Sequence, residues 1–84
     1  MYKIVKRQQL NDTVVRLDIK APFVAKKAEP GQFIILRASE DGERIPLTVA
    51  DFDRENGTVT VIFQIVGATT VELSMKNEGE FIPD

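Results

Sequence analysis

A chain of 84 residues can form one small domain, and it is too short to bury two separate hydrophobic cores. Its formal net charge is -2 and its lysines and arginines are scattered, so the sequence has no basic patch for nucleic acid or an anionic membrane. The absence of cysteine and histidine excludes disulfides, thiolate or imidazole catalysis and iron-sulfur ligation by these residues. With neither a signal-peptide core nor a membrane-length apolar run, we expect a cytoplasmic protein.

Most of the sequence carries the alternating or continuous apolar patterns that are typical of β-strands. The expected strands cover residues 2–9, 15–20, 32–37, 45–51, 58–66 and 80–82. In the second of these, Val15, Leu17 and Ile19 share one face, which predicts a half-buried strand. Asn11-Asp12 supplies the turn before it, and Asn56-Gly57 is the strongest hairpin signal in the chain.

The middle of the chain contains the proline residues that limit these strands. Pro22 and Pro30-Gly31 bracket a connection that we expect to be irregular. The strand over 32–37 follows, and because Phe33 to Leu36 is apolar on both faces, we expect it to lie centrally in the sheet. Pro46 is tolerable only at the start of its strand or at a sheet edge.

One segment near the C-terminus has the signals of a helix. In Thr69-Thr70-Val71-Glu72, a capping box predicts Thr69 at the N-cap and Glu72 reaching back to it, with the helix running to about Met75. Asn77 and Gly79 would end the helix. Five or six antiparallel strands and one short helix predict an all-β fold, a small closed barrel.

The fourth expected strand carries the first candidate binding segment. Alternate residues of a strand share a face, so Arg44, Pro46 and Thr48 would present a cation, a rigid apolar surface and a hydroxyl together. Such a face could hold a phosphate and the edge of a heteroaromatic ring. The alternative is an ordinary edge strand whose proline discourages aggregation and whose polar groups are solvated.

The start of the expected helix is the second candidate. Gly67 and Ala68 let a ligand approach the first amides of the helix, and Thr69 and Thr70 add hydroxyls, a combination suited to phosphate. The alternative is a simple helix cap, and Glu72 would compete with an anion for the same amides. The carboxylates elsewhere cluster at expected turns, so the sequence predicts neither an acid-base pair nor a metal site.

Three segments, at residues 29–33, 44–48 and 66–73, together resemble the ordered motifs of the ferredoxin-NADP reductase superfamily. Within it, the chain is similar to the electron-transfer subunits of dihydroorotate dehydrogenase and the small subunits of sulfide dehydrogenase, over essentially all 84 residues. The resemblance implies a six-stranded antiparallel Greek-key barrel that binds FAD. It also implies a role in an oxidoreductase that transfers electrons between NAD(P)H and ferredoxin-like carriers.

The resemblance also implies roles for individual residues. Thr48 would form a hydrogen bond near the reactive ring nitrogen, Leu47 would contact the ring, and Gly67, Thr69 and Thr70 would hold the pyrophosphate. Phe63, Gln64 and Ile65 would run beside the flavin or its ribityl chain. The full set of cofactor-binding candidates is Arg44, Pro46, Leu47, Thr48, Phe63, Gln64, Ile65, Gly67, Thr69 and Thr70.

The sequence departs from the family pattern at the second motif. Arg44 stands four residues before Thr48, where most members place it three before, and Leu47 stands where plant-type members have an aromatic residue. Ring stacking at Leu47 should therefore be weaker, and the contact made by Arg44 stays open.

Residues 1–84 are expected to form a single FAD-binding-type barrel without the C-terminal nucleotide-binding domain and the cysteine-ligated [2Fe-2S] centre that related subunits carry. Such a chain would depend on that domain or on a partner subunit and would be catalytically incomplete alone. The alternative is a flavin-free β-barrel that serves as an interaction or structural module and self-associates into a homo-oligomer. The choice between FAD and FMN stays open, although a pyrophosphate site at the helix start favours the dinucleotide.

Overall fold

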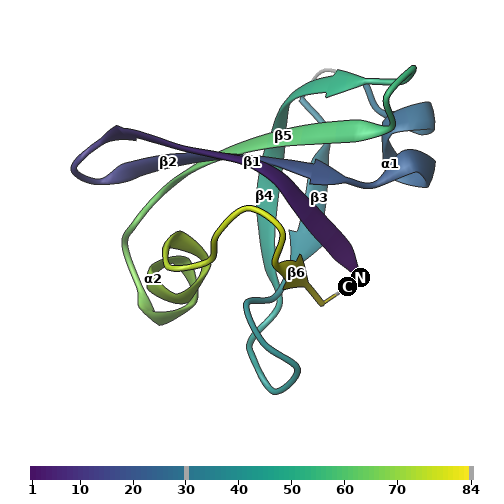
Figure 1. The fold of residues 1–84 in the computed structure, drawn as a ribbon. Coiled ribbons are helices and arrows are strands. Elements are labelled where there is room, and N and C mark those ends of the chain that lie inside the picture. The colour runs from purple at the N-terminus through teal and green to yellow at the C-terminus, as the bar shows by residue number, and fades with distance from the viewer. Residues whose placement is uncertain (30, 84) are drawn as a thin grey trace.

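The computed structural model describes residues 1–29 and 31–83, which form six strands and two short helices. In chain order these elements are β1 (Tyr2–Asn11), β2 (Val14–Lys20), α1 (Pro22–Lys27), β3 (Phe33–Leu36), β4 (Ile45–Asp53), β5 (Thr58–Gln64), α2 (Ala68–Ser74) and β6 (Phe81–Ile82). The strand order across the sheet is β3-β4-β5-β2-β1-β6, and every neighbouring pair is antiparallel. Figure 1 shows that the sheet is strongly twisted and curved, so that it has a concave and a convex face.

The topology confirms the expected all-β Greek-key arrangement. β3, β4 and β5 are joined as successive hairpins, and β5 rather than β3 pairs with β2, which is the order that defines a Greek key. Among the described residues β3 and β6 are the two edges of the sheet and do not pair with each other. The sheet is therefore a curled half-barrel rather than a barrel closed by strand pairing.

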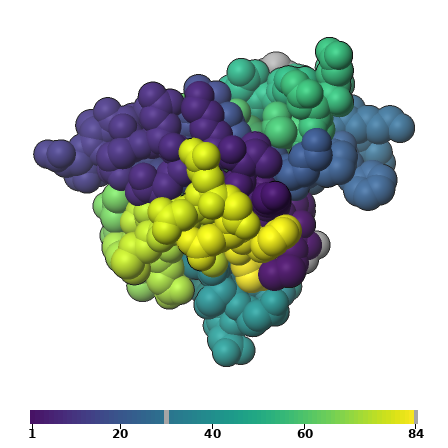
Figure 2. Space-filling model, viewed as in Figure 1, coloured from purple at the N-terminus to yellow at the C-terminus, as the bar shows by residue number. Residues whose placement is uncertain are grey.

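Because side chains alternate along each strand, the apolar ones point to the concave face of the sheet and form the core there. On β2, Val15, Leu17 and Ile19 are fully buried while the residues between them point outward, as the period of two predicted. Val59, Val61 and Phe63 of β5 pack against them, and β6 and α2 contribute Ile82 and Leu73. In Figure 2 the C-terminal segment, in yellow, fills the space between the β1–β2 hairpin and the loop that precedes β4.

The prediction that β3 lies centrally is wrong, because β3 is an edge strand. Ile34 and Leu36 point into the core, whereas Phe33 and Ile35 point outward and remain 60% and 51% exposed. A continuous apolar run predicts a strand that is covered on both faces. Here the outward pair is left on the surface, next to Thr48 and Pro46 of β4.

The expected irregular connection after Pro22 is also wrong over residues 22–27, which form α1. Proline suits the first turn of a helix because its missing N–H would have no helical partner there. Ala25 is fully buried, and Lys26 and Lys27 lie in the last turn, where positive charge complements the helix dipole. Pro30, the other limit of that connection, lies outside the described residues.

The β4–β5 turn confirms the Asn56-Gly57 signal. Gly57 adopts a positive φ of 69°, and the Asn56 amide donates to Oδ1 of Asp53 over 3.0 Å. In the described part of the chain, neither helix is long and apolar enough to cross a membrane.

Candidate functional site

Two adjoining hollows lie between β4, the end of β5 and the start of α2. The larger, of about 430 Å³, is lined by Ile45, Pro46, Leu47, Thr48, Ile62, Phe63, Gln64, Val66 and Thr70. The smaller, of about 210 Å³, is lined by Glu43, Ile45, Val66, Gly67, Ala68, Thr69 and Thr70. Because Ile45, Val66 and Thr70 line both, the hollows form one continuous surface depression, which we call the groove. The two segments singled out in the sequence therefore meet.

Strand alternation builds the wall formed by β4. Pro46 and Thr48 are exposed and pair with Ile35 and Phe33 of β3, so their side chains share the outward face. Pro46 is the second residue of β4, the position at a strand start where proline is tolerated. Thr48 forms no side-chain hydrogen bond with the residues that the structure describes, so its hydroxyl is free for a ligand.

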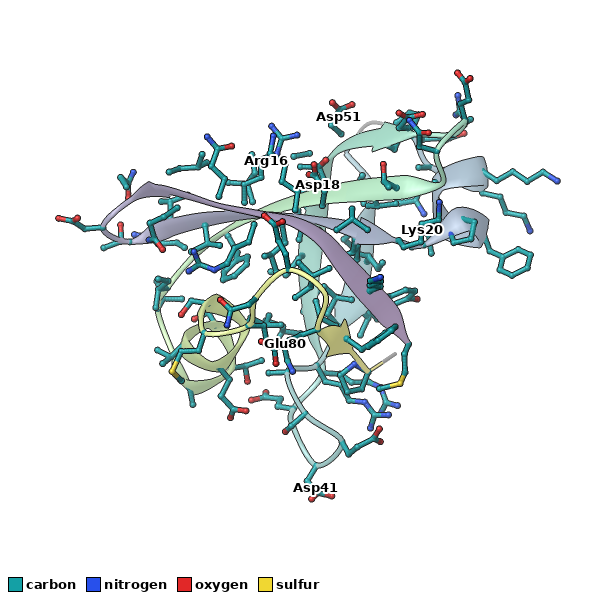
Figure 3. The ribbon with its side chains drawn as sticks, in the orientation of Figure 1. Arg16, Asp18, Lys20, Asp41, Asp51 and Glu80 are labelled. Carbon is teal, nitrogen blue, oxygen red and sulfur yellow. The ribbon has the colours of Figure 1, made fainter. Side chains whose placement is uncertain are left out.

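Arg44 is not part of this wall. It precedes the first residue of β4, is exposed, and does not line either hollow. Its neighbour Glu43 lines the smaller hollow in its place. Both belong to the loop between β3 and β4, whose tip carries the solvent-facing Asp41 labelled in Figure 3.

The chain leaves β5 and turns toward the start of α2, as Figure 1 shows, and this turn forms the other wall. Oγ1 of Thr70 accepts hydrogen bonds from the amides of Val66, at 2.8 Å, and Gly67, at 3.0 Å. The same hydroxyl donates to the Gly67 carbonyl oxygen over 3.0 Å, so its full hydrogen-bonding capacity is used.

The expected capping box is therefore wrong by two residues. Gly67 is the N-cap and Thr70 is the third helical residue, which reaches back to the N-cap amide. Glu72 lies beyond this turn, and in the described part of the chain it is Thr70 that binds the turn amides. The Thr69 hydroxyl forms no hydrogen bond with the described residues, so Thr69 rather than Thr70 has a free donor beside the first helical amides.

The sequence predicted three cofactor-binding residues at the end of β5, and two of the three line the groove. Phe63 and Gln64 line the larger hollow. Ile65 does not, because it packs against the core while its amide donates to the Thr13 carbonyl oxygen over 2.7 Å.

Some lining residues are not among the ten cofactor-binding candidates. Ile45, Val66 and Ala68 belong to the candidate segments but were not assigned a contact, and Glu43 and Ile62 lie outside those segments. Strand alternation could have identified Ile62, which stands two residues before Gln64 and is exposed with it. Val66, 74% exposed and shared by both hollows, follows the end of β5 and has no periodic signal.

The groove is suited to binding more than to acid-base chemistry. Of the described residues that line it, Glu43 alone has an ionisable side chain. No cluster of three or more carboxylates that could hold a metal ion occurs in residues 1–29 and 31–83. Arg16, Asp18 and Asp51, on the sheet face turned away from α2 in Figure 3, do not line it. What the groove offers is an apolar surface, free threonine hydroxyls and helix-start amides.

A separate hollow of about 340 Å³ lies beside α1. Its lining includes Lys20, Pro22, Phe23 and Val24 and none of the expected site residues.

Comparison of the sequence with known proteins identifies relatives whose matches extend over nearly the whole chain. No family model matches. The chain is 55% identical over 84 residues to an uncharacterised protein of Clostridium beijerinckii, and 48% identical over 82 residues to the dihydroorotate dehydrogenase B (NAD(+)) electron transfer subunit homologue of Thermotoga maritima. These matches cover 100% and 98% of this chain but only 28% and 29% of those proteins.

Solved structures agree with this result. An NADH-dependent reduced ferredoxin-NADP oxidoreductase, described in connection with flavin-based electron bifurcation, matches the whole chain with a TM-score of 0.96 and 46% identity, over 30% of its own chain. A siderophore-interacting protein from Acinetobacter baumannii has a TM-score of 0.75 over 96% of this chain and 37% of its own, and at 22% identity it shows the shared fold alone. The chain is thus similar, over about 30% of their length, to electron transfer subunits of dihydroorotate dehydrogenase B and to an NADH-dependent reduced ferredoxin-NADP oxidoreductase.

Proposed function

We propose that the chain is the flavin-binding barrel domain of an electron-transfer oxidoreductase linked to NAD(P)H and ferredoxin, and that the groove binds FAD. The observation that carries this proposal is the meeting of residues 46–48 with residues 66–70 around adjoining hollows. Segments separated by about twenty positions place an apolar surface and a phosphate-compatible turn side by side.

The larger hollow fits the ring of a flavin. Its volume of about 430 Å³ falls within the range of roughly 300–1,000 Å³ that is usual for small-molecule sites. Pro46, Leu47 and Ile62 supply apolar surface, and Thr48 supplies a hydroxyl that can donate to a ring acceptor.

The smaller hollow fits phosphate groups. The amides of residues 68–70 have no helical partner at the start of α2, and the Thr69 hydroxyl is a further donor. Glu43 acts against an anion here, although solvent screening keeps this effect small because Glu43 is exposed. A groove with an apolar part and an amide-lined part suits a ligand that joins an aromatic ring to phosphate groups, as FAD does.

A bound flavin supplies the redox chemistry, because it can exchange a hydride with a nicotinamide and single electrons with a carrier. The residues of this chain would bind and orient it. Pro46 and Ile62 would exclude water from one face, and Thr48 would hold a proton in a hydrogen bond at the ring edge. The chain spans less than a third of the length of its curated relatives, so the nicotinamide site would belong to another domain or a partner subunit.

A second candidate function is a flavin-free module that self-associates, and the edge strand β3 favours it. Phe33 and Ile35 are 60% and 51% exposed, and β3 contains no charged residue or proline to discourage pairing with another strand. Sedimentation of the FAD-free protein would test this candidate, which requires a concentration-dependent dimer that Ile35→Lys abolishes.

A titration of FAD into the purified protein, followed by flavin fluorescence, tests the proposed function. Val66→Glu places a charge where both hollows meet, and should weaken binding at least about tenfold, the effect of roughly 1.4 kcal/mol. Val71→Glu is the matched control, because Val71 is also exposed on this part of the chain but lines neither hollow. Absence of binding by the wild type, or equal binding by both variants, would reject the assignment.

A further inference from the structure

The last residue of α2 is bound by an arginine from the opposite end of the sequence. Nε and Nη2 of Arg7, on β1, donate to the Ser74 carbonyl oxygen over 3.1 and 2.6 Å. We propose that Arg7 is a positioning residue for the groove, which it does not touch: it fixes the C-terminal end of α2 and thereby the place of the turn at residues 66–70. This inference rests on the proposed function for its ligand.

The interaction is suited to anchoring a helix end. The last carbonyl groups of a helix have no partner within it, and a positive charge there is favoured by the helix dipole. The Arg7 side chain is partly buried, and Nη2 also donates to Oε1 of Gln9 over 2.9 Å, which holds the guanidinium along β1. The amide of Arg7 donates to Oε2 of Glu78 over 3.2 Å, so the segment after α2 is attached to the same residue.

The helix has few other ties to the sheet. α2 has seven residues, too few to be stable without tertiary contacts. Its apolar anchor is Leu73, which is fully buried in the core. Within residues 1–29 and 31–83, the Thr70 side chain forms hydrogen bonds with Val66 and Gly67 alone, so these bonds fix the shape of the turn and not its position relative to β4. The chain entering the turn is held by Ile65, whose amide donates to the Thr13 carbonyl oxygen over 2.7 Å, whereas the direction in which α2 leaves the turn depends on Leu73 and Arg7, at the far end of the helix.

The length of α2 makes this dependence direct. Seven helical residues span about 10 Å at 1.5 Å per residue, so a tilt at Ser74 moves Ala68 and Thr69 relative to Pro46 and Thr48 across the groove. Loss of the Arg7 anchor should thus change the ligand site without removing any group from it.

Arg54 provides a matched control elsewhere in the molecule. Its Nη2 donates to the Ala28 carbonyl oxygen over 2.8 Å and its Nε to that of Lys26 over 3.3 Å, so it binds the C-terminal end of α1 in the same way. Neither α1 nor Arg54 lines the groove. A purely structural role for Arg7 predicts that both arginines affect FAD equally.

The test compares Arg7→Gln, Arg7→Lys and Arg54→Gln in the full chain by two measurements. The first is hydrogen exchange of the ligand-free proteins by NMR. Arg7→Gln should speed exchange in α2, for example at the Val71 amide bound to the Gly67 carbonyl oxygen, and shift the resonances of residues 66–70. Arg54→Gln should leave both unchanged.

The second measurement is FAD affinity, taken below the onset of unfolding for each variant. Arg7→Gln should weaken binding about tenfold, Arg7→Lys should recover part of the loss, and Arg54→Gln should stay within about twofold of wild type. Equal losses in Arg7→Gln and Arg54→Gln, or wild-type affinity in Arg7→Gln, would overturn the inference. If the wild type itself binds no FAD, the proposed function fails, while unchanged exchange of α2 in Arg7→Gln would separately overturn the positioning role.

Discussion

Replacing Thr70 with valine is the sharpest test of how the turn before α2 is built. Valine keeps the shape of threonine but removes the hydroxyl, which accepts from the amides of Val66 and Gly67 and donates to the Gly67 carbonyl oxygen. A net contribution of about 0.5–1.5 kcal/mol is typical of one hydrogen bond. Val66 and Gly67 are exposed, so water replaces part of the loss, and we expect a decrease of about 1–2 kcal/mol in the free energy of unfolding.

Urea and thermal unfolding followed by circular dichroism would measure this decrease. For a domain of this size, each kcal/mol should lower Tm by about 4–8 °C. Thr70→Ser keeps the hydroxyl and should lose less, and Thr69→Val should change stability by less than about 0.5 kcal/mol because Thr69 makes no such bonds in the described structure. Equal stability of Thr70→Val and Thr69→Val would refute the assignment of Thr70 as the residue whose hydroxyl binds back to the N-cap amide.

Three further predictions concern the groove and the β4–β5 turn. Thr48→Val should weaken FAD binding several-fold, by about 0.5–1.5 kcal/mol, with Tm unchanged, as fluorescence titration and thermal unfolding would show. Glu43→Gln should tighten FAD binding modestly, and the gain should shrink in a titration at 1 M salt, because it removes a screened charge from the smaller hollow. Hydrogen bonds from Asn56 lower the pKa of Asp53 below its usual 3.8. Because the lower pKa belongs to the folded state, Asp53 stabilises the fold above the unfolded-state pKa and loses this effect as pH falls through the folded-state value. Urea unfolding between about pH 5 and 2 should accordingly show a shallower acid-side loss of stability in Asp53→Asn than in wild type.

The strands were predictable because their signal is local. Alternation at Val15, Leu17 and Ile19 and the turn at Asn56-Gly57 specify β2 and the β4–β5 hairpin without knowledge of the rest of the chain. The position of β3 was not predictable in this way. An apolar run does not reveal whether its outward residues, Phe33 and Ile35, are covered or exposed.

The helices depended on contacts between distant segments. α1 is too short for a periodic pattern, and its end is held by Arg54 from the β4–β5 turn. The start of α2 was predicted two residues too late because each of two adjacent threonines fits a capping role. Thr69 could be the N-cap, and Thr70 could be the third helical residue that binds back to an earlier N-cap. The hydrogen bonds of Thr70 show that the second arrangement is the one formed.

Most of the candidate residues nevertheless line the groove, and their role in binding a cofactor stays a prediction. Of the ten expected side chains, Arg44 and Ile65 lie outside the lining of the groove. Arg44 belongs to the loop before β4, and Ile65 is drawn into the core, which are outcomes of packing that spacing does not encode. The preference for FAD over FMN, the cytoplasmic location and the separate nicotinamide domain stay predictions.

An NMR titration of the isotope-labelled chain with FAD tests the central claim most directly. The account predicts that the amide shifts change most at Thr48, at Ile62 and along residues 66–70, on both walls of the groove. Changes confined to residues 20–24 beside α1, or an unchanged spectrum at millimolar FAD, would contradict it.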